Sequence, residues 1–227
     1  MKCDLHIHTH YSYDGSSSPK KMVDAAIKKG IDCLAITDHG EIKGAKEAIE
    51  YAKGKPILII PGIEIKSKGG DIIGLNIKEK IPSGLSVKKT IQKIKELGGK
   101  VIIPHPFGWV RNFKLDFEEI IDEIDAIEVL NAGIFGAGNR KALAFAKKFN
   151  LPQTCGSDAH YKDNVGKAYL EIPGKNLSIE DIFKQIKDKN VKICGEKFNF
   201  FENVLERFQR GMAKIIFLYV RRKKRKI

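Results

Sequence analysis

The sequence predicts an α/β fold built on a mainly parallel sheet, because short β-branched runs alternate with amphipathic segments along the chain. The short runs are rich in Ile, Leu and Val, as buried strands are. The segments between them carry apolar residues at helical spacing. Such a strand–helix repeat closes either into a barrel or into a doubly wound sheet. In both architectures the functional residues are expected at the carboxyl ends of the strands.

The strands are expected where Ile, Leu and Val cluster between turn residues. The first strand is expected at Asp4–His8 and the second at Cys33–Thr37. The later strands are expected at Ile57–Ile60, Ile72–Ile77, Val101–Ile103, Ala126–Leu130, Gln153–Cys155, Ala168–Ile172 and Lys192–Cys194.

The helices are expected between these strands. Pro19 suits the first turn of a helix over Lys20–Lys29, which Gly30 ends. Ser178, followed three residues later by Asp181, predicts the N-cap of another helix. The further helices are expected over Ile42–Ala52, Val87–Leu97, Phe117–Ile124, Arg140–Phe149 and Ile179–Lys187.

The length of 227 residues suits one domain with a short extension. We expect the α/β domain over 1–197, an amphipathic helix over 198–220 that packs on this domain, and a disordered basic tail over 221–227. The net charge is +13, and the tail contributes six consecutive basic residues, Arg221–Lys226. The charge therefore fits anionic partners without selecting one.

Composition excludes several classes of protein. Hydrophobic residues make up 42% and charged residues 30%, which argues against wholesale disorder. The apolar run Ile215–Val220 is far shorter than the roughly 20 residues that span a bilayer. The four cysteines form no Cys-x-x-Cys pair, and the charged N-terminus does not resemble a signal peptide. We therefore expect a cytoplasmic protein with no disulfide scaffold, no thiolate zinc site and no integral membrane span.

Every histidine lies at or just after an expected strand, and carboxylates accompany them. Side chains two residues apart on a strand point to the same side, so a His-x-His pair can grip one cation. Imidazole and carboxylate ligands without thiolate suit Mn²⁺, Fe²⁺ or Zn²⁺ better than Ca²⁺ or Mg²⁺. There are too many such ligands for one tetrahedral ion, so two or three divalent ions are predicted. The histidines are His6, His8, His10, His39, His105 and His160, and the carboxylates include Asp14, Glu64 and Asp158.

Five motifs together resemble those of the PHP (polymerase and histidinol phosphatase) family over about residues 1–172. They are Asp4-Leu5-His6-Ile7-His8-Thr9, Thr37-Asp38-His39-Gly40, Gly62-Ile63-Glu64, Pro104-His105-Pro106 and Gly156-Ser157-Asp158-Ala159-His160. Ser12-Tyr13-Asp14-Gly15 resembles the tryptophan-operon-associated branch of the family most. Relatives of that kind act on 3′,5′-bisphosphonucleotides and on the 5′ ends of RNA with Mn²⁺-type clusters. The resemblance implies a distorted seven-stranded (β/α) barrel.

The resemblance also implies a ligand set and a mechanism. Glu64 would bridge two metals, and Asp14 stands where many relatives have histidine. A further histidine of some relatives is absent from Glu128–Gly133, which leaves one coordination position open. A hydroxide bridging two metals would attack phosphorus in line while the metals neutralise the phosphate oxygens. The implied ligands are His6, His8, Asp14, His39, Glu64, His105, Asp158 and His160.

The remaining site residues are candidates from the sequence. The catalytic candidates are His39, Asp158 and His10, and the leaving group would be protonated by a metal-bound water, His10 or His39. Trp109 is a candidate for stacking on a base, with plain packing as the alternative. The basic tail would raise the affinity for RNA in a salt-dependent way. The phosphate-binding candidates are Lys66, Arg140 and Arg111, with a solvated surface charge as the alternative for each.

The predicted function is that of a metal-dependent phosphoesterase acting on phosphate esters of nucleotides or short nucleic acids. The substrate would be a small phosphorylated molecule, namely a nucleotide or an RNA or DNA end. Two alternatives stay open: a histidinol-phosphate phosphatase, and a non-catalytic RNA-binding protein on the same barrel. An amidohydrolase barrel also opens with His-x-His, but the later motifs do not support it. Bound metal together with turnover would discriminate between an enzyme and a binding protein.

Overall fold

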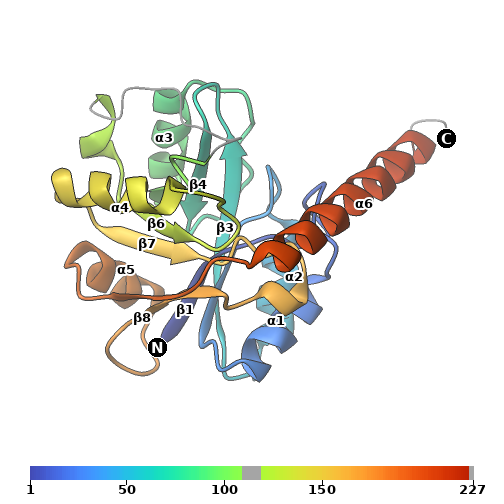
Figure 1. Ribbon diagram of the computed structural model, residues 1–227, viewed down its shortest axis with the longest axis horizontal. Helices are drawn as coiled ribbons and strands as arrows, with labels where there is room; N and C mark the ends of the chain where they lie inside the picture. Colours follow the sequence, from blue (N-terminus) through green and yellow to red (C-terminus); the bar gives the residue numbers. More distant parts are fainter. Residues whose placement is uncertain (109–118, 225–227) are drawn as a thin grey trace.

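The structure is a computed structural model that describes residues 1–108 and 119–224. Within them, nine strands form one sheet in the order β7-β6-β5-β4-β3-β2-β1-β8-β9 (Figure 1). The strands are β1 Lys2–Ile7, β2 Cys33–Ile36, β3 Leu58–Lys66, β4 Asp71–Leu75, β5 Lys100–Ile103, β6 Ala126–Asn131, β7 Gln153–Gly156, β8 Ala168–Glu171 and β9 Lys192–Gly195.

The sheet curls into a nearly closed barrel. The backbone N–H of Asp158, just beyond β7, donates to the carbonyl of His6 at 2.9 Å. The N–H of His8 in turn donates to the carbonyl of Ala159 at 2.9 Å. These two bonds join the carboxyl end of β7 to that of β1, and the isolated bridge between Ile7 and Ala159 is parallel. The α/β barrel predicted from the sequence is therefore confirmed.

The number of strands implied by the family resemblance is wrong, because the sheet has nine strands and not seven. The reason is that two different segments pair with the edge of β1 that lies away from β2. β8 pairs antiparallel with Lys2 and Cys3 at the start of β1, whereas the residues after β7 bond to its end. β9 then pairs antiparallel with β8. The two extra strands thus branch from the barrel instead of lying in its ring.

Parallel strands place their carboxyl ends at one end of the barrel. β1, β2 and β3 run parallel, and so do β5, β6 and β7. β4 interrupts this order because it pairs antiparallel with both β3 and β5. The carboxyl ends of the parallel strands therefore open on one end of the barrel, where functional residues of such folds are found.

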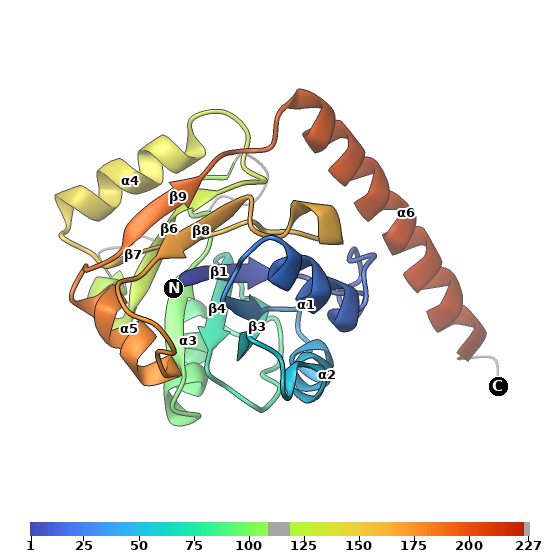
Figure 2. The same cartoon turned by 90° about the horizontal axis from the view of Figure 1, so that it is seen from below.

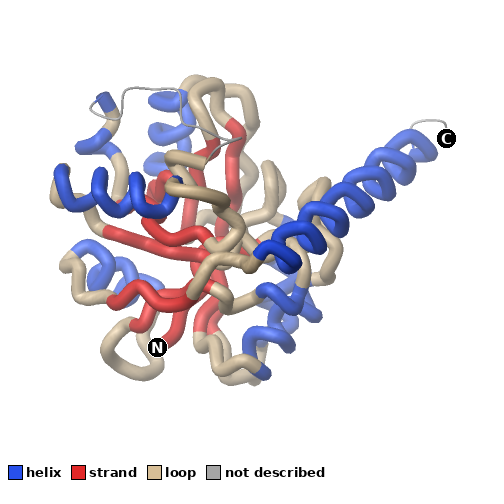
Figure 3. Tube along the Cα trace, in the orientation of Figure 1, coloured by secondary structure: helices blue, strands red, loops and turns tan. Residues whose placement is uncertain are grey.

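Helices surround the strands (Figure 3). The side-chain hydroxyls of Ser18, Ser86 and Ser178 cap α1, α3 and α5, and Ser178 forms a capping box with Asp181. The helix expected over Phe117–Ile124 lies partly outside the described residues, and its described part holds only a 3₁₀ turn at Ile121–Glu123. The helices are α1 Pro19–Lys28, α2 Lys43–Ala52, α3 Val87–Glu96, α4 Gly138–Lys148, α5 Ile179–Lys187 and α6 Phe200–Lys224.

Alternate residues of the strands fill two layers of core. Leu34 and Ile36 of β2 are fully buried in a cluster with residues of α1 and α2. Cys33 and Ala35 belong instead to a cluster with Ile60 and with residues of the other strands. Residues of α5 pack against that second cluster. This alternation fixes which side chains of each strand face the barrel interior.

Helix α6 projects from the barrel and contacts it along one side only (Figures 1 and 2). It meets the barrel through polar side chains, because Asn203 and Glu206 are buried whereas Phe201 is 81% exposed. The polar side of α6 faces inward because it meets a polar end of the barrel. The helix continues through Lys224, four residues into the basic run. Among the described residues, no helix has the length and apolarity needed to cross a membrane.

Candidate metal centre

All eight predicted ligands meet at the carboxyl end of the barrel. They come from the end of β1 and the loops after β1, β2, β5 and β7, and from β3. Seven of them are buried, and the side chain of His39 is 12% exposed. The eight residues are His6, His8, Asp14, His39, Glu64, His105, Asp158 and His160.

One group of donor atoms forms around His6 and His8. Their Nε2 atoms lie 3.0 Å apart. His8 Nε2 is 3.3 Å from both Glu64 Oε2 and Asp158 Oδ1, and His6 Nε2 is 3.6 Å from the same two oxygens. His105 Nε2 lies 3.1 Å from the other oxygen of Glu64. Glu64 thus presents one oxygen to His105 and the other to His6 and His8.

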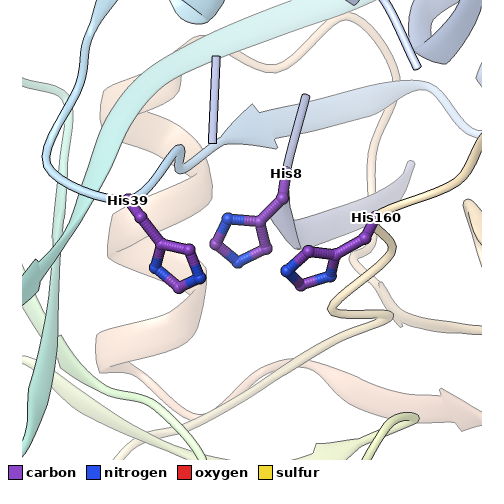
Figure 4. Close-up of side chains that lie close together, drawn as sticks. All are labelled: His8, His39 and His160. Carbon is purple, nitrogen blue, oxygen red and sulfur yellow. The ribbon is translucent and has the colours of Figure 1, made fainter. Parts of the chain in front are cut away.

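A second group forms around three imidazoles, His8, His39 and His160, which lie in a row with His8 between the other two (Figure 4). The rings of His39 and His160 are 4.3 and 4.2 Å from that of His8. Asp14 Oδ1 lies 3.5 Å from His39 Nε2 and 3.4 Å from His160 Nε2. His39 Nδ1 is 2.8 Å from Glu64 Oε2, so Glu64 links the second group to the first.

These spacings suit donors that share a cation. Two ligand atoms about 2.1 Å from one ion lie about 3.0 to 3.4 Å apart in octahedral or tetrahedral arrangements. Asp158 Oδ1 and His160 Nε2 are buried and have no hydrogen-bond partner among the described residues. A buried polar atom without a partner is costly, and a cation would relieve that cost. Nitrogen and carboxylate donors therefore fit divalent ions at both groups.

Glu128 of β6 supports the ligands from behind. Its Oε1 lies 3.0 Å from His6 Nδ1. Its Oε2 accepts from the backbone N–H of His105 at 2.8 Å and from Asn131 Nδ2 at 2.9 Å. Such outer contacts fix the tautomer and orientation of a metal-binding imidazole. Sequence reasoning treated this stretch only as the place of an absent histidine; a carboxylate within an otherwise apolar strand was the signal for its role.

Ser12 supports His8 in the same way. Its hydroxyl lies 3.1 Å from His8 Nδ1 and donates to Asp38 Oδ1 at 2.9 Å. Asp38 also accepts from the N–H and the hydroxyl of Thr9, at 2.6 and 2.7 Å. These contacts, from carboxylate to hydroxyl to imidazole, hold the His8 ring in one orientation.

The backbone near the ligands adopts rarely populated conformations. His105 has φ 30° and Asp158 has φ 53°, both in the left-handed region. A side chain at Gly156 would place its Cβ 2.3 Å from His6 Cβ. Strain and close approach of this kind cluster at functional sites, where they fix the direction of side chains.

Burial and neighbouring charges shift the pKa values of the cluster in different directions. Burial alone would raise the pKa of Asp158, but the charge of His6 beside it holds that pKa well below its usual range. Burial lowers the pKa of His160 to about 3, and Arg210 adds to this effect. Against the effect of burial, the charge of Glu64 raises the pKa of His39 to about 9, and the charges of Asp158 and Glu128 raise that of His6. Metals bind the ionised carboxylate and the neutral imidazole, so a bound cation would displace the protons of His6 and His39.

Comparison with known proteins decides the family. The model of the PHP domain matches residues 4–195. This chain belongs to the PHP domain family. The family assignment predicted from the five motifs is therefore confirmed.

Relatives of this PHP domain include uncharacterised proteins and one named nuclease. An uncharacterised protein of Methanocaldococcus jannaschii is 42% identical over 143 residues, which cover 58% of this chain and 82% of that protein. A 5′-3′ exoribonuclease of Haemophilus influenzae is 35% identical over 99 residues, which cover 42% of this chain and 36% of that protein. The fold is similar to that of a two-domain protein of Bacteroides vulgatus containing a predicted PHP-like metal-dependent phosphoesterase. The TM-score is 0.74 at 20% identity, covering 92% of this chain and 69% of that one.

Helix α6 of this PHP domain reaches the cluster with charged side chains. Glu206 Oε1 accepts from the backbone N–H of His160 at 3.0 Å. Arg210 donates from Nε and Nη2 to Asp14 Oδ2 at 3.2 and 2.7 Å. Residues four apart share one face of a helix, so both side chains point to the barrel. The sequence analysis named neither residue, because it described this helix by its apolar spacing alone.

A cleft of about 300 Å³ opens beside the cluster, with His105 and Asp158 at its wall. Its positive charges come from α6, because Arg207 and Arg210 line it together with Phe135. The predicted phosphate-binding residues do not lie in it: Lys66 and Arg140 are exposed, and neither is among the residues that line this cleft. The other two predictions, Arg111 and Trp109, lie outside the described residues.

The predicted catalytic residues divide between two places. His39 and Asp158 lie in the cluster. His10 is exposed, and its ring lies 4.5 Å from that of Tyr11. It lines a separate, mostly apolar groove of about 830 Å³ together with residues of α6 such as Phe208 and Met212. His10 is therefore outside the eight ligands that the fold brings together.

Proposed function

We propose that this PHP domain is a metal-dependent phosphoesterase that hydrolyses phosphate esters of nucleotides or short nucleic acids. The observation that carries the proposal is the pair of donor groups joined by Glu64, beside a cleft that holds two arginines. Arg207 presents N–H donors that suit the anionic oxygens of a phosphate ester, in a cleft that the carboxylates of Asp158 and Glu206 also line. Two proteins of similar fold, each 20% identical, are described as a predicted PHP-like and a putative metal-dependent phosphoesterase, which supports the same reaction class.

Two or three divalent ions, of the Mn²⁺, Fe²⁺ or Zn²⁺ type, are the proposed cofactors. His6, His8, Glu64, His105 and Asp158 would hold one part of the centre. The other part would be held by Asp14, His39 and His160, with Glu64 shared between them. Bound there, such ions acidify water and neutralise the oxygens of a phosphate ester.

The side chains of the protein would hold the reacting groups in place. His39 is the one cluster histidine that is partly exposed, at 12% of its side chain, so it can exchange a proton with a substrate at the mouth of the site. His39 would protonate the leaving group only where it does not hold an ion through the nitrogen that faces the substrate, because a metal-bound nitrogen carries no proton. The buried position of the other ligands excludes bulk water from the donor atoms, which strengthens their attraction for a cation.

Two observations favour nucleotide phosphates over other esters. Phe135, 47% exposed, and Phe198 line the cleft with the arginines, and an aromatic ring beside a cationic group suits a base joined to a phosphate. The similarity to the exoribonuclease of Haemophilus influenzae points to the same class, although it covers 36% of that protein. The cleft volume lies at the lower end of the range for small-molecule sites, which suits a single nucleotide.

The test is phosphate release by the Mn²⁺-loaded protein. The panel contains a nucleoside 3′,5′-bisphosphate, short RNA with a 5′ phosphate, histidinol phosphate and an aryl phosphate. The control is a variant carrying both D158N and H160A. We expect the wild-type protein to release phosphate from the nucleotide substrates and the variant to release none. A preference for histidinol phosphate would contradict the proposed substrate, and metal-loaded protein that released phosphate from none of them would contradict the proposed reaction.

A further inference from the structure

Helix α6 carries an apolar side that faces away from the barrel (Figure 2). Polar contacts hold its inner side. Glu206 accepts from the backbone N–H of His160 at 3.0 Å, and Lys167 Nζ donates to Glu202 at 2.6 Å. Phe208 lies about 200° around the helix from Glu206, since each residue turns the chain by about 100°. The exposed large apolar side chains of α6 are Phe200, Phe201, Val204, Leu205, Phe208, Met212, Ile215, Ile216, Leu218, Tyr219 and Val220.

This outer side is wider than the seam between two packed helices. From Phe200 to Tyr219 it runs for about 28 Å and covers about 160° of the helix circumference. A two-stranded coiled coil uses two positions in seven, whereas eleven of the residues 200–220 are exposed and apolar here. An amphipathic helix that lies in a membrane interface has an apolar face of this width. The charged residues of the stretch all lie outside the apolar side, and they are Glu202, Glu206, Arg207, Arg210 and Lys214.

The charge next to the apolar side selects an anionic occupant. Six consecutive basic residues, Arg221–Lys226, follow it directly, and α6 continues into this run as far as Lys224. A lipid bilayer with anionic headgroups offers an apolar interior and a negative surface together.

A second copy of the chain matches this charge less well, because it brings the same basic run. Two α6 helices packed in parallel would set the two runs side by side, where like charges repel. Packed antiparallel, each run would meet the start of the other helix. The carboxylate there, Glu202, already pairs with Lys167 at 2.6 Å.

We propose that the outer side of α6 docks the protein on the surface of an anionic membrane, with the helix axis in the plane of the interface. The apolar side chains would enter the boundary between headgroups and acyl chains, and the basic run would bind the headgroups. Among the described residues no helix is apolar and long enough to span the bilayer, which fits binding at the surface. The barrel would then lie on the water side of α6. This inference goes beyond the proposed function and does not depend on hydrolysis.

Two variants separate the apolar contribution from the charge. One carries L205Q and I215Q, which remove exposed apolar side chains from the outer side and leave the net charge unchanged. The other carries R222Q, K223Q and K224Q, which lower the net charge by three within the basic run. Its matched control carries K21Q, K46Q and K89Q, which lower the net charge equally at exposed positions of α1, α2 and α3. General electrostatic attraction therefore changes by the same amount in both triple variants.

The experiment measures co-sedimentation of the metal-loaded protein, freed of unbound metal, with lipid vesicles. One set of vesicles contains phosphatidylcholine alone, and the other contains equal parts of phosphatidylcholine and phosphatidylglycerol. We expect the wild-type protein to bind the anionic vesicles and to bind less as salt is raised. We expect the partition coefficient to fall about tenfold or more in the variant with L205Q and I215Q and in the variant of the basic run. The lysine control should fall much less, and melting curves of all variants should match the wild type because the changed residues are exposed.

Several results would overturn the inference. Wild-type protein that bound neither kind of vesicle, or both equally, would refute docking on an anionic membrane. Unaltered binding by the variant with L205Q and I215Q would remove the apolar side from it, and an equal fall in the lysine control would remove the basic run. Sedimentation velocity without lipid tests the other occupant. A dimer that L205Q and I215Q convert to a monomer, in protein that does not bind vesicles, would show that a second copy covers this side instead.

Discussion

Arg210 and Asp14 are 196 residues apart in the sequence, yet Nε and Nη2 of Arg210 both donate to Oδ2 of Asp14. The other oxygen of Asp14 faces His39 Nε2 and His160 Nε2, at 3.5 and 3.4 Å. The guanidinium fork fixes the plane of the carboxylate and so determines where Oδ1 points. The C-terminal helix is thus part of the support of the candidate metal centre.

Substitution R210A should weaken the centre. Outer contacts that orient a ligand typically contribute 10- to 100-fold to metal affinity or activity, and we expect a loss of about that size. R210K keeps the charge without the fork and should recover part of the loss. Mn²⁺ titration and kcat on the best substrate measure both effects. R222A is the control, and R210A protein with unaltered Mn²⁺ affinity and kcat would contradict the role of this contact.

Glu128 should matter as much although it is not a predicted ligand. E128Q removes the charge that faces His6 Nδ1 and one of the two acceptor oxygens. We expect Mn²⁺ affinity to fall by about 10- to 100-fold. The same measurement on E79Q, which removes an exposed carboxylate, should show no change. Equal affinities in E128Q and E79Q would mean that Glu128 has no part in orienting the ligands.

Removal of metal should lower the stability of the protein. A ligand that binds only the folded state stabilises it by about 2.7 kcal/mol at 100 times its dissociation constant. We therefore expect the melting temperature to fall on chelation and to recover when Mn²⁺ is added back. The variant with both D158N and H160A should lose most of this response. A wild-type melting curve that is the same with chelator and with excess Mn²⁺ would argue against a metal centre.

Gly156 should not tolerate a side chain. The Cβ of an alanine there would lie 2.3 Å from His6 Cβ and 2.8 Å from the His6 nitrogen. G156A should therefore destabilise the protein by about 1–3 kcal/mol or more, as overpacking does. G211A is the matched control, since a Cβ at Gly211 of α6 meets nothing within 4 Å. Alanine favours a helix interior over glycine, so G211A should keep or raise the melting temperature.

Two phenylalanines near the start of α6 should differ in their effect on stability. Phe198 is 5% exposed and Phe201 is 81% exposed. F198A should lower the free energy of unfolding by about 3–5 kcal/mol, because it removes a buried ring. F201A should change it by less than about 0.5 kcal/mol. Denaturant unfolding of the two variants measures the difference, and a large loss in F201A would show that the outer side of α6 is covered.

The sequence by itself determined much of the fold and most of the candidate centre. Clusters of Ile, Leu and Val marked the strands, and Ser18, Ser86 and Ser178 capped helices that local patterns predicted. His6 and His8 share a side of one strand because side chains alternate. The other ligands follow strand ends, and strands that run parallel bring those ends together. These signals are local, or depend only on strand direction, so they could be read without coordinates.

The tertiary structure alone decided the rest. It showed that β8 and β9 branch from β1, that Glu128 supports two ligands, and that α6 turns its polar side to the centre. It also showed that the arginines lining the cleft are Arg207 and Arg210, whereas the sequence had suggested Lys66 and Arg140 as phosphate-binding residues. Each of these contacts joins residues far apart in the chain. Their partners are set by how the barrel closes and where α6 leaves it, and no local periodicity encodes either.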